Sequence, residues 1–525
     1  MGILSVSNYS ILPSIAGGLG VSFNTVQYIL FLPIVVLLYY LLPAKLRLVW
    51  LLGVSYYFYM QWNAKYAILL FTCTLITYVG GLLLERFSGQ QEDTENNGNG
   101  EGRNSIKRKL CFMLCLLSNL GILAFFKYSA FGVSLLNQML SFFHFRTLPW
   151  NVNILLPVGI SFYTLQALGY LIDVYRGDIH AEKNFIYYAL FVSFFPQLVA
   201  GPIERSKNLL AQFHTLHKWE YENFRRGLLL ILYGLFLKMV IADRAAILVD
   251  KVYGDPLEYP GVYIIVATIF FSIQIYCDFY GYSTIARGSA LLMGIRLMDN
   301  FNAPYYSKSV KEFWRRWHIS LSGWFRDYLY IPLGGNKKGD TYKERNRMIV
   351  FAVSGLWHGA SLSFVFWGVL NGIYQVAEDL VKKLKRKMTG EEERGTHSFG
   401  KRLFQTAFTF VLITFAWLFF RSGSLSEAKN ILSSMSHCNN WLVLLDGSLY
   451  ELGVRRHYMG VLMLSILTLF VVDYQKYQGK DVVSLFYSQN WLFRTVAILM
   501  LAFVILLYGC YGRIYDIQQF IYFQF

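Results

Sequence analysis

The chain has 525 residues, of which 55% are hydrophobic and 18% aromatic, while only 15% are charged. Soluble proteins carry about 25% charged residues, so this composition excludes an ordinary set of soluble domains and favours a membrane protein. The net charge is +16, but lysine and arginine gather in short segments beside apolar runs, and no soluble basic domain is present. Nucleic-acid binding is therefore not expected.

Apolar runs long enough to cross a bilayer as helices recur along the whole chain. They lie near residues 21–43, 46–62, 65–84, 110–126, 128–143, 154–174, 184–200, 227–242, 260–295, 346–372, 403–420, 458–473 and 492–510. Some runs could be split or re-entrant, so the sequence predicts an all-α polytopic integral membrane protein with about 11–14 transmembrane helices. The expected location is the cell membrane (inner or plasma membrane), with the lipid bilayer as the surrounding partner.

Three polar stretches interrupt this pattern. Residues 86–109 are rich in glycine, asparagine and acidic residues, which is typical of a flexible loop. Residues 382–402 begin with the basic run KKLKRK and are predicted to be cytoplasmic. Residues 296–347 are polar and basic but also crowded with aromatic residues, a composition that a plain linker would not have.

The run 346–372 is predicted to be broken rather than straight. The basic residues of 308–347 and those of 382–402 both favour the cytoplasm, and one straight helix between them would place them on opposite sides. The middle of the run reads SGLWHGAS, whose small residues can break a helix where its backbone is buried in protein. We therefore expect a kink, a re-entrant segment or a short hairpin.

Residues 309–335 are predicted to form one amphipathic helix at the membrane surface. Ser309 and Glu312 match a capping box at its start, and Pro332 and two glycines would end it. The aromatic residues recur at helical spacing, and a second face carries the following polar residues: Lys311, Arg315, His318, Ser322 and Arg326. The neighbouring cations should lower the pKa of His318, and a neutral imidazole can take a proton from a hydroxyl. The alternative is an interfacial residue without a chemical role.

His358 is the second candidate, because it lies inside an otherwise apolar run. An ionisable side chain at membrane depth is a functional candidate by default, although a structural histidine with a buried partner is the alternative. Gly355 and Gly359 would let another helix approach closely. No metal site is predicted, because neither histidine has a third ligand at suitable spacing.

Two further windows carry polar residues at the edge of apolar runs. In 274–288, Asp278 and Tyr282 share a helix face, and Asp278 could orient a histidine, pair with an arginine of 309–335, or form a structural ion pair with Arg287. In 194–213, prolines and a glycine end a span before a basic segment, which suits either a tunnel mouth or an interfacial turn.

Four strings in these windows resemble the membrane-bound O-acyltransferase (MBOAT) family: FFPQLVAGPIERS, YCDFYGYSTIARG, FWRRWHISLSGWFRDYLYIPLGG and SGLWHG. The branch that acetylates alginate is more similar than the branch that transfers D-alanine to teichoic acids. The resemblance covers roughly residues 20–425. It implies a ring of tilted helices around a central tunnel, with a core over 1–425 and additional transmembrane spans over 426–525.

The resemblance also implies an O-acyltransferase with His318 and His358 as catalytic residues. The residues expected to help bind substrate or donor are Arg315, Arg316, Trp317, Ser322, Arg326, Asp278, Tyr282 and Trp357. No cofactor would be bound; acetyl-CoA or an acylated carrier protein would serve as co-substrate. The implied partners are a polysaccharide acceptor, secreted or membrane-tethered acetylation proteins and an acyl carrier protein.

Other classes of function remain open from the sequence. D-alanyl or other acyl transfer to a cell-wall polymer is the nearest alternative. A transporter or channel component of a polysaccharide export complex would also suit many spans and a broken helix, but it predicts paired motifs in two halves, which the sequence lacks.

Overall fold

The computed structural model describes residues 22–92, 101–149, 156–199, 201–389 and 398–511. In chain order the helices are α1 Val26–Leu41, α2 Ala44–Asn63, α3 Tyr66–Glu92, α4 Glu101–Phe142, α5 Ile160–Arg176, α6 Phe185–Ser193, α7 Phe195–Leu198, α8 Ser206–Phe213, α9 Tyr221–Leu235, η1 Phe236–Ala242, α10 Asp243–Gly254, α11 Val262–Leu292, η2 Pro304–Tyr306, α12 Val310–Arg316, α13 Ile319–Phe325, η3 Arg326–Tyr330, α14 Asp340–His358, α15 Leu362–Thr389, α16 Phe399–Arg421, α17 Leu425–Ser436, η4 Trp441–Leu444, η5 Ser448–Glu451, α18 Arg456–Tyr477, α19 Val482–Tyr487 and α20 Trp491–Tyr508. Those described residues contain no strand, which confirms the predicted all-α class.

By length and composition, six helical stretches of the described chain could cross a membrane. They are Ala44–Ser88, Ser105–Phe142, Val262–Leu292, Phe399–Arg421, Arg456–Tyr477 and Trp491–Tyr508, and the shorter apolar helices Val26–Leu41 and Phe185–Leu198 accompany them. The class of polytopic membrane protein is thereby confirmed. The exact number of crossings and the central tunnel stay predictions.

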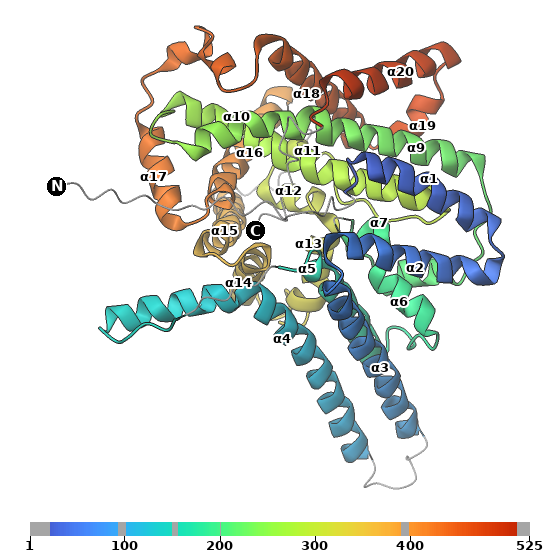
Figure 1. Ribbon diagram of the computed structural model, residues 1–525. Coiled ribbons are helices and arrows are strands. Elements are labelled where there is room, and N and C mark those ends of the chain that lie inside the picture. Colours follow the sequence, from blue (N-terminus) through green and yellow to red (C-terminus); the bar gives the residue numbers. More distant parts are fainter. Residues whose placement is uncertain (1–21, 93–100, 150–155, 200, 390–397, 512–525) are drawn as a thin grey trace.

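Helix α11 lies at the centre of the molecule and α20 at its edge. In the most apolar part of α11, 72% of the residues are buried, against 6% for α20. Helix α9 packs along α11 at very short distance, since a Cβ atom on Gly227 would lie 2.8 Å from the carbonyl oxygen of Gly288. Figure 1 shows α3 and α4 extending away from this body, while α18 to α20 lie on the opposite side of it.

At both of its described ends the polar stretch 86–109 is helical rather than the flexible loop that its composition predicts; residues 93–100 lie outside the described residues. Helix α3 continues through Glu92 and α4 begins at Glu101. Extending an existing helix adds one hydrogen bond for each residue that it orders, so helices propagate readily into polar sequence. The guanidinium of Arg108 also lies over the ring of Tyr175 at 5.2 Å, which ties the start of α4 to the body.

The predicted break in 346–372 is confirmed as a hairpin. Helix α14 ends at His358, and α15 begins at Leu362 and returns along it. The predicted close approach at Gly355 and Gly359 is also confirmed, because a Cβ atom on either glycine would lie 2.2 Å from an atom of Phe364. No larger side chain fits there, so these glycines permit the hairpin.

Ion pairs join the two far ends of this hairpin. Lys343 and Arg347 on α14 both reach Asp379 on α15, each at 3.0 Å. The basic segments before α14 and at the end of α15 therefore lie at the same end of the molecule, as the positive-inside rule demands. We call this the basic end.

Candidate active site

His318 stands at a break in the segment that the sequence predicts to be one helix. The predicted helix start at Ser309 is confirmed, since its hydroxyl accepts a hydrogen bond from the Glu312 backbone N–H at 3.2 Å, while the Glu312 carboxylate accepts from the backbone N–H of Lys308. The helix nevertheless ends at Arg316, and His318 adopts the left-handed conformation, with φ 43° and ψ 55°, immediately before α13. Residues other than glycine rarely adopt positive φ, and such strain concentrates at functional sites.

Residues 300–302 compensate the broken backbone. The N–H of Ile319 donates to the carbonyl of Asn300 at 3.0 Å, and the N–H of Asn302 donates to the carbonyl of Arg316 at 3.0 Å. The side-chain oxygen of Asn300 also accepts from the N–H of Ser320 at 3.3 Å. Backbone groups that a continuous helix would pair are thus paired by a neighbouring segment, which lets the break persist in a buried position.

The imidazole of His318 is buried among aromatic rings from three other helices. Its centroid lies 4.6 Å from Phe279 of α11, 6.2 Å from Trp357 of α14 and 6.4 Å from Phe162 of α5. Only 1% of His318 is exposed. The hydroxyl of Ser320 lies 3.5 Å from its Nδ1 atom. An interfacial position facing water, as the sequence predicts for His318, is therefore wrong.

His358 lies at the other break and shares the same aromatic cluster. Its ring centroid is 4.9 Å from Trp357, 5.1 Å from Trp367 and 5.3 Å from Phe420. Trp357 contacts both histidines, so the tertiary structure brings the two imidazoles, 40 positions apart in the chain, to one place. A small apolar cluster, separate from the main core, adjoins them: Phe162, Leu165, Leu168, Ile203, Leu321, Trp324, Phe325 and Trp357.

Both histidines are neutral at physiological pH. Burial lowers the pKa of His318 from 6.5 to about 3. Burial also lowers the pKa of His358 well below its usual value. The neutral imidazole at His318 agrees with the expectation from sequence, but its cause is desolvation rather than neighbouring arginines.

Lys127 of α4 is a candidate that the sequence interpretation missed. Its ammonium donates hydrogen bonds to the carbonyl oxygens of Trp357 at 2.6 Å and His358 at 3.1 Å, and lies 3.4 Å from the Ser161 hydroxyl. These carbonyls belong to the C-terminus of α14, where a cation is favoured. The available signal was a lysine between two apolar runs, an expensive place for a charge.

The three arginines of the 309–335 window lie with other groups. Arg315 and Arg326 are exposed, and Arg326 pairs with Asp327 at 2.7 Å. Arg316 pairs with Glu312 at 3.0 Å and lies over the ring of Tyr477. The predicted face that groups these cations with His318 is wrong, because the backbone turns at 317–318 and changes the direction of the later side chains.

Trp317 and Ser322 take structural positions beside the break. Trp317 is buried, with its ring 5.0 Å from both Phe301 and Trp417. The Ser322 hydroxyl donates to the carbonyl of Trp317 at 3.3 Å. These contacts stabilise the turn that carries His318.

Asp278 pairs with a residue that the sequence interpretation did not consider. Its carboxylate lies 2.7 Å from the ammonium of Lys238, which also lies 2.7 Å from Asp243. One of the alternatives, a pair of Asp278 with Arg287, is wrong, since Arg287 pairs with Asp299. Lys238 belongs to the π-helical segment η1, whose wider turn is a common feature of functional regions.

Tyr282 belongs to the same polar group as Asp278. The Lys238 ammonium lies 5.5 Å from the centre of its ring, and its hydroxyl is 2.8 Å from that of Ser22. Because Asp278 and Phe279 are neighbours on α11, this ionic group and the histidine site flank one helix.

The window 194–213 packs against η3, the segment that follows α13. Arg205 pairs with Asp327 at 2.9 Å and stacks over Tyr328 at 4.5 Å. Glu204 is buried and accepts a hydrogen bond from the Asn208 amide at 2.6 Å. Burial raises the pKa of Glu204, and the hydrogen bonds that it accepts oppose this shift.

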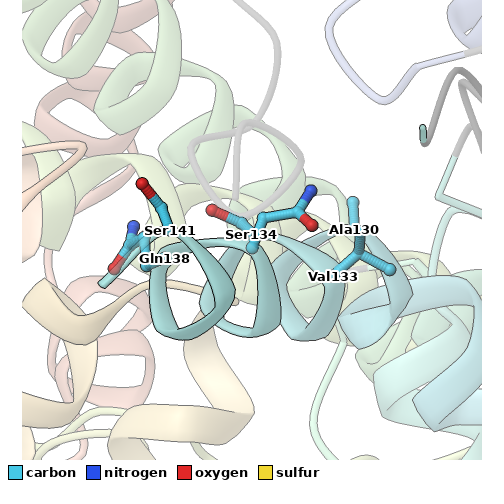
Figure 2. A pocket seen from close by; sticks show the side chains of 6 residues that line it. Ala130, Val133, Ser134, Gln138 and Ser141 are labelled. Atoms are coloured by element: carbon cyan, nitrogen blue, oxygen red, sulfur yellow. The ribbon is translucent and has the colours of Figure 1, made fainter. Parts of the chain in front are cut away.

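A hollow of about 570 Å³ on the projecting part of α4 is not a second candidate (Figure 2). It is lined by Ala130, Val133, Ser134, Asn137, Gln138 and Ser141. None of these side chains titrates near neutral pH. Within the described part of the chain, no group of three or more His, Cys, Asp or Glu residues could hold a metal ion.

The fold and the site together define a polytopic membrane protein with two imidazoles buried among its helices. The comparison with known proteins gives the family: the chain belongs to the membrane-bound O-acyltransferases (MBOAT), and the model of that family matches residues 178–421. The protein is thus an O-acyltransferase that takes its acyl group from a donor co-substrate, and this membership replaces the transporter or channel alternative.

Three relatives place the chain within this family. It is 37% identical to a probable alginate O-acetylase of Pseudomonas putida, over 80% of each chain. It is 34% identical to a peptidoglycan O-acetyltransferase of Helicobacter pylori, over 79% of this chain and 80% of the relative. It is 30% identical to a teichoic acid D-alanyltransferase of Streptococcus thermophilus, over 45% of this chain and 60% of the relative.

Proposed function

We propose that this enzyme moves an acetyl group from a cytoplasmic thioester donor to a hydroxyl group on an exported polysaccharide. The observation that carries the proposal is the pair of neutral, buried imidazoles, His318 and His358, gathered around Trp357. The two most similar relatives described above are named for O-acetyl transfer to polysaccharides, which supports acetyl over D-alanyl as the group transferred.

In the proposed reaction His318 is the general base. A neutral imidazole nitrogen takes the proton as the acceptor oxygen attacks the thioester carbonyl carbon. The tetrahedral intermediate then collapses, the carbon–sulfur bond breaks, and the imidazolium returns the proton to the leaving thiolate. His358 hydrogen-bonds the oxyanion or the acceptor hydroxyl. The two histidines could exchange these roles without altering the balance of the reaction.

Lys127 acts in this proposal as a positioning residue. Its ammonium holds the last carbonyls of α14, next to His358, and its contact with Ser161 links α14 to α5. All three ammonium protons are directed to protein groups, so Lys127 orients the site rather than contacting substrate.

The remaining parts of the proposal follow the family. The donor is acetyl-CoA or an acylated carrier protein, and secreted or membrane-tethered acetylation proteins receive or deliver the acyl group. Donor and acceptor would meet in a central tunnel within the core 1–425, with 426–525 as additional spans. Among the expected binding residues, Trp357 lines the site, and Arg315, on the same helix as Lys311 of the basic end, is placed to attract an anionic donor.

An acetyl-transfer assay tests this function. The protein is reconstituted in nanodiscs with acetyl-labelled acetyl-CoA or acetylated carrier protein, and labelled acetate release or transfer to oligosaccharides is followed. We expect His318→Gln to lower turnover by about 10²–10⁴-fold. His180→Gln is the matched control, because that imidazole is 98% exposed. Unchanged turnover in His318→Gln and His358→Gln would overturn the proposed site, and turnover with D-alanylated carrier alone would assign the D-alanyl alternative.

A further inference from the structure

A cavity of about 1180 Å³ lies between the body and the C-terminal helices. Its walls come from α9, α11 and residues 296–302 on one side and from α18, α19 and α20 on the other. In Figure 1 these C-terminal helices lie along α9. The cavity exceeds the roughly 300–1,000 Å³ typical of pockets for drug-sized ligands. We call it the seam cavity.

The seam cavity is charged at one end and apolar at the other. Along α9 its lining changes from Arg226 to Leu230, and along α18 it changes from Lys476 to Val472. Ile319, the residue that follows His318, also lines the cavity. We call the charged end the rim and the apolar end the floor. A cavity with this gradient matches a ligand that has a polar head and an apolar chain.

Positive charge is in excess at the rim. Its three carboxylates pair with three arginines: Glu222 with Arg225 and Arg226, Asp481 with Arg226 at 3.1 Å, and Asp299 with Arg287. The other cations that line the cavity are Arg296, Lys476 and Lys480. Lys476 donates to the Tyr280 hydroxyl and the Phe301 carbonyl, and the nearby carboxylates of Asp299 and Asp473 offset part of its charge, so the positive excess lies with Arg296 and Lys480.

The rim lies at the basic end of the molecule. Tyr477, at the end of α18, lies under Arg316 at 4.7 Å and Lys308 at 5.8 Å. Lys311, on the same helix as Arg316, pairs with Asp379 of α15. The Asp379 carboxylate also pairs with Lys343 and Arg347 of α14. The rim therefore lies where anionic headgroups attract cationic side chains.

We propose that the seam cavity binds an anionic membrane phospholipid, with its phosphate beside Arg296 and Lys480 and its acyl chain along the floor. Helix α20 favours a lipid over a soluble donor. It exposes Leu499 and Met500, each 62% exposed, on the outside, and lines the cavity with Ala497 and Leu501. An acyl chain on the floor would thus continue the bilayer that surrounds α20. The proposal does not depend on the reaction assigned to His318.

The role of this lipid is to join the C-terminal helices to the body. The rest of the protein buries only 6% of the residues in the apolar part of α20, so few side-chain contacts attach this helix to the body. A chain that fills the floor would add apolar contact between α9, α18 and α20, and the phosphate would bridge the cations of the two sides.

Binding to delipidated full-length protein tests the proposal. Phosphatidylglycerol, phosphatidylcholine or coenzyme A is added in detergent, with native mass spectrometry for retained lipid and thermal unfolding for stability. We expect phosphatidylglycerol to bind at least tenfold more tightly than phosphatidylcholine, to raise the unfolding temperature, and not to be displaced by coenzyme A. Removing two rim cations in Arg296→Gln/Lys480→Gln should weaken its binding by about tenfold or more.

Matched variants separate the cavity from general membrane attraction. Lys337→Gln/Lys338→Gln removes two exposed cations from the basic end and should leave binding unchanged. Ala497→Phe fills the floor and should block retention, whereas Met500→Phe on the outer face of α20 should not. Equal binding of both phospholipids, or equal effects of the cavity and control variants, would overturn the proposal. Displacement of the lipid by coenzyme A would assign the cavity to a soluble phosphate-bearing donor instead.

Discussion

The two breaks that carry the histidines are built in different ways. The break at His358 relies on glycines, because Gly355 and Gly359 let α15 return against α14 without a side chain between them. The break at His318 contains no glycine; the histidine itself takes the left-handed conformation, and residues 300–302 pair the released backbone groups. The break at His358 is thus permitted because its glycines have no side chains, whereas the break at His318 is stabilised by tertiary hydrogen bonds.

The largest effect is expected at the glycine break. In Gly355→Ala, the new methyl carbon would lie 2.2 Å from the Phe364 carbonyl oxygen and 3.1 Å from the Val365 Cα atom, so the hairpin must open. We expect a loss of about 3 kcal/mol or more in the free energy of unfolding. Chemical unfolding in detergent measures it. Gly400→Ala, where nothing lies within 4 Å, should not destabilise and would contradict this reasoning if it did.

Lys127 links the break at His358 to α5, and its replacement should lower activity more than stability. Lys127→Met removes the cation from the C-terminus of α14. We expect kcat to fall by about 10–100-fold, which corresponds to the loss of one charged hydrogen bond. The KM for the donor should change little. Lys127→Arg should recover part of kcat.

Steady-state kinetics with both variants measure this split. Lys107→Met, an exposed position on the same helix, is the control. A loss of folded protein in Lys127→Met that matches the loss of activity would contradict a positioning role.

The two histidines should also make the protein sensitive to acid. The pKa of His318 is about 3 in the folded protein and 6.5 ordinarily, so the unfolded chain binds the proton more readily. Stability from this group is fully present above about pH 6.5 and is lost progressively as the pH falls from 6.5 towards 3. His318→Gln should flatten the dependence of the unfolding free energy on pH in this window, and an unchanged slope would argue against a buried, neutral His318.

The smallest effect concerns the backbone at His318. His318→Gly and His318→Ala both remove the imidazole, but only glycine adopts φ 43° without strain. We expect the Gly variant to be more stable than the Ala variant by about 1 kcal/mol, with equal loss of turnover. Thermal unfolding of both variants measures the difference, and a more stable Ala variant would mean that the left-handed turn relaxes.

Several features followed from the sequence by itself, because they depend on local composition. Apolar runs of bilayer length specify the all-α membrane class, and the basic segments on both sides of SGLWHGAS require a break, since their charges must stay on one side of the membrane. The helix start at Ser309 depends on residues only three positions apart. His358 stands out for the same local reason, as an ionisable residue in an apolar run.

Other features were decided only by the tertiary structure. Helical periodicity places His318 beside Arg315 and Arg326. In the folded chain, Asn300 and Asn302, which precede that helix in the sequence, pair with backbone groups of residues 316–320. The helix therefore breaks, and the imidazole of His318 points into an aromatic cluster. The partner of Asp278 proved to be Lys238, 40 residues away. Hydrogen bonds and ion pairs between distant segments leave no periodic pattern, so the meeting of two histidines, a lysine and a tryptophan could be found only in the folded chain.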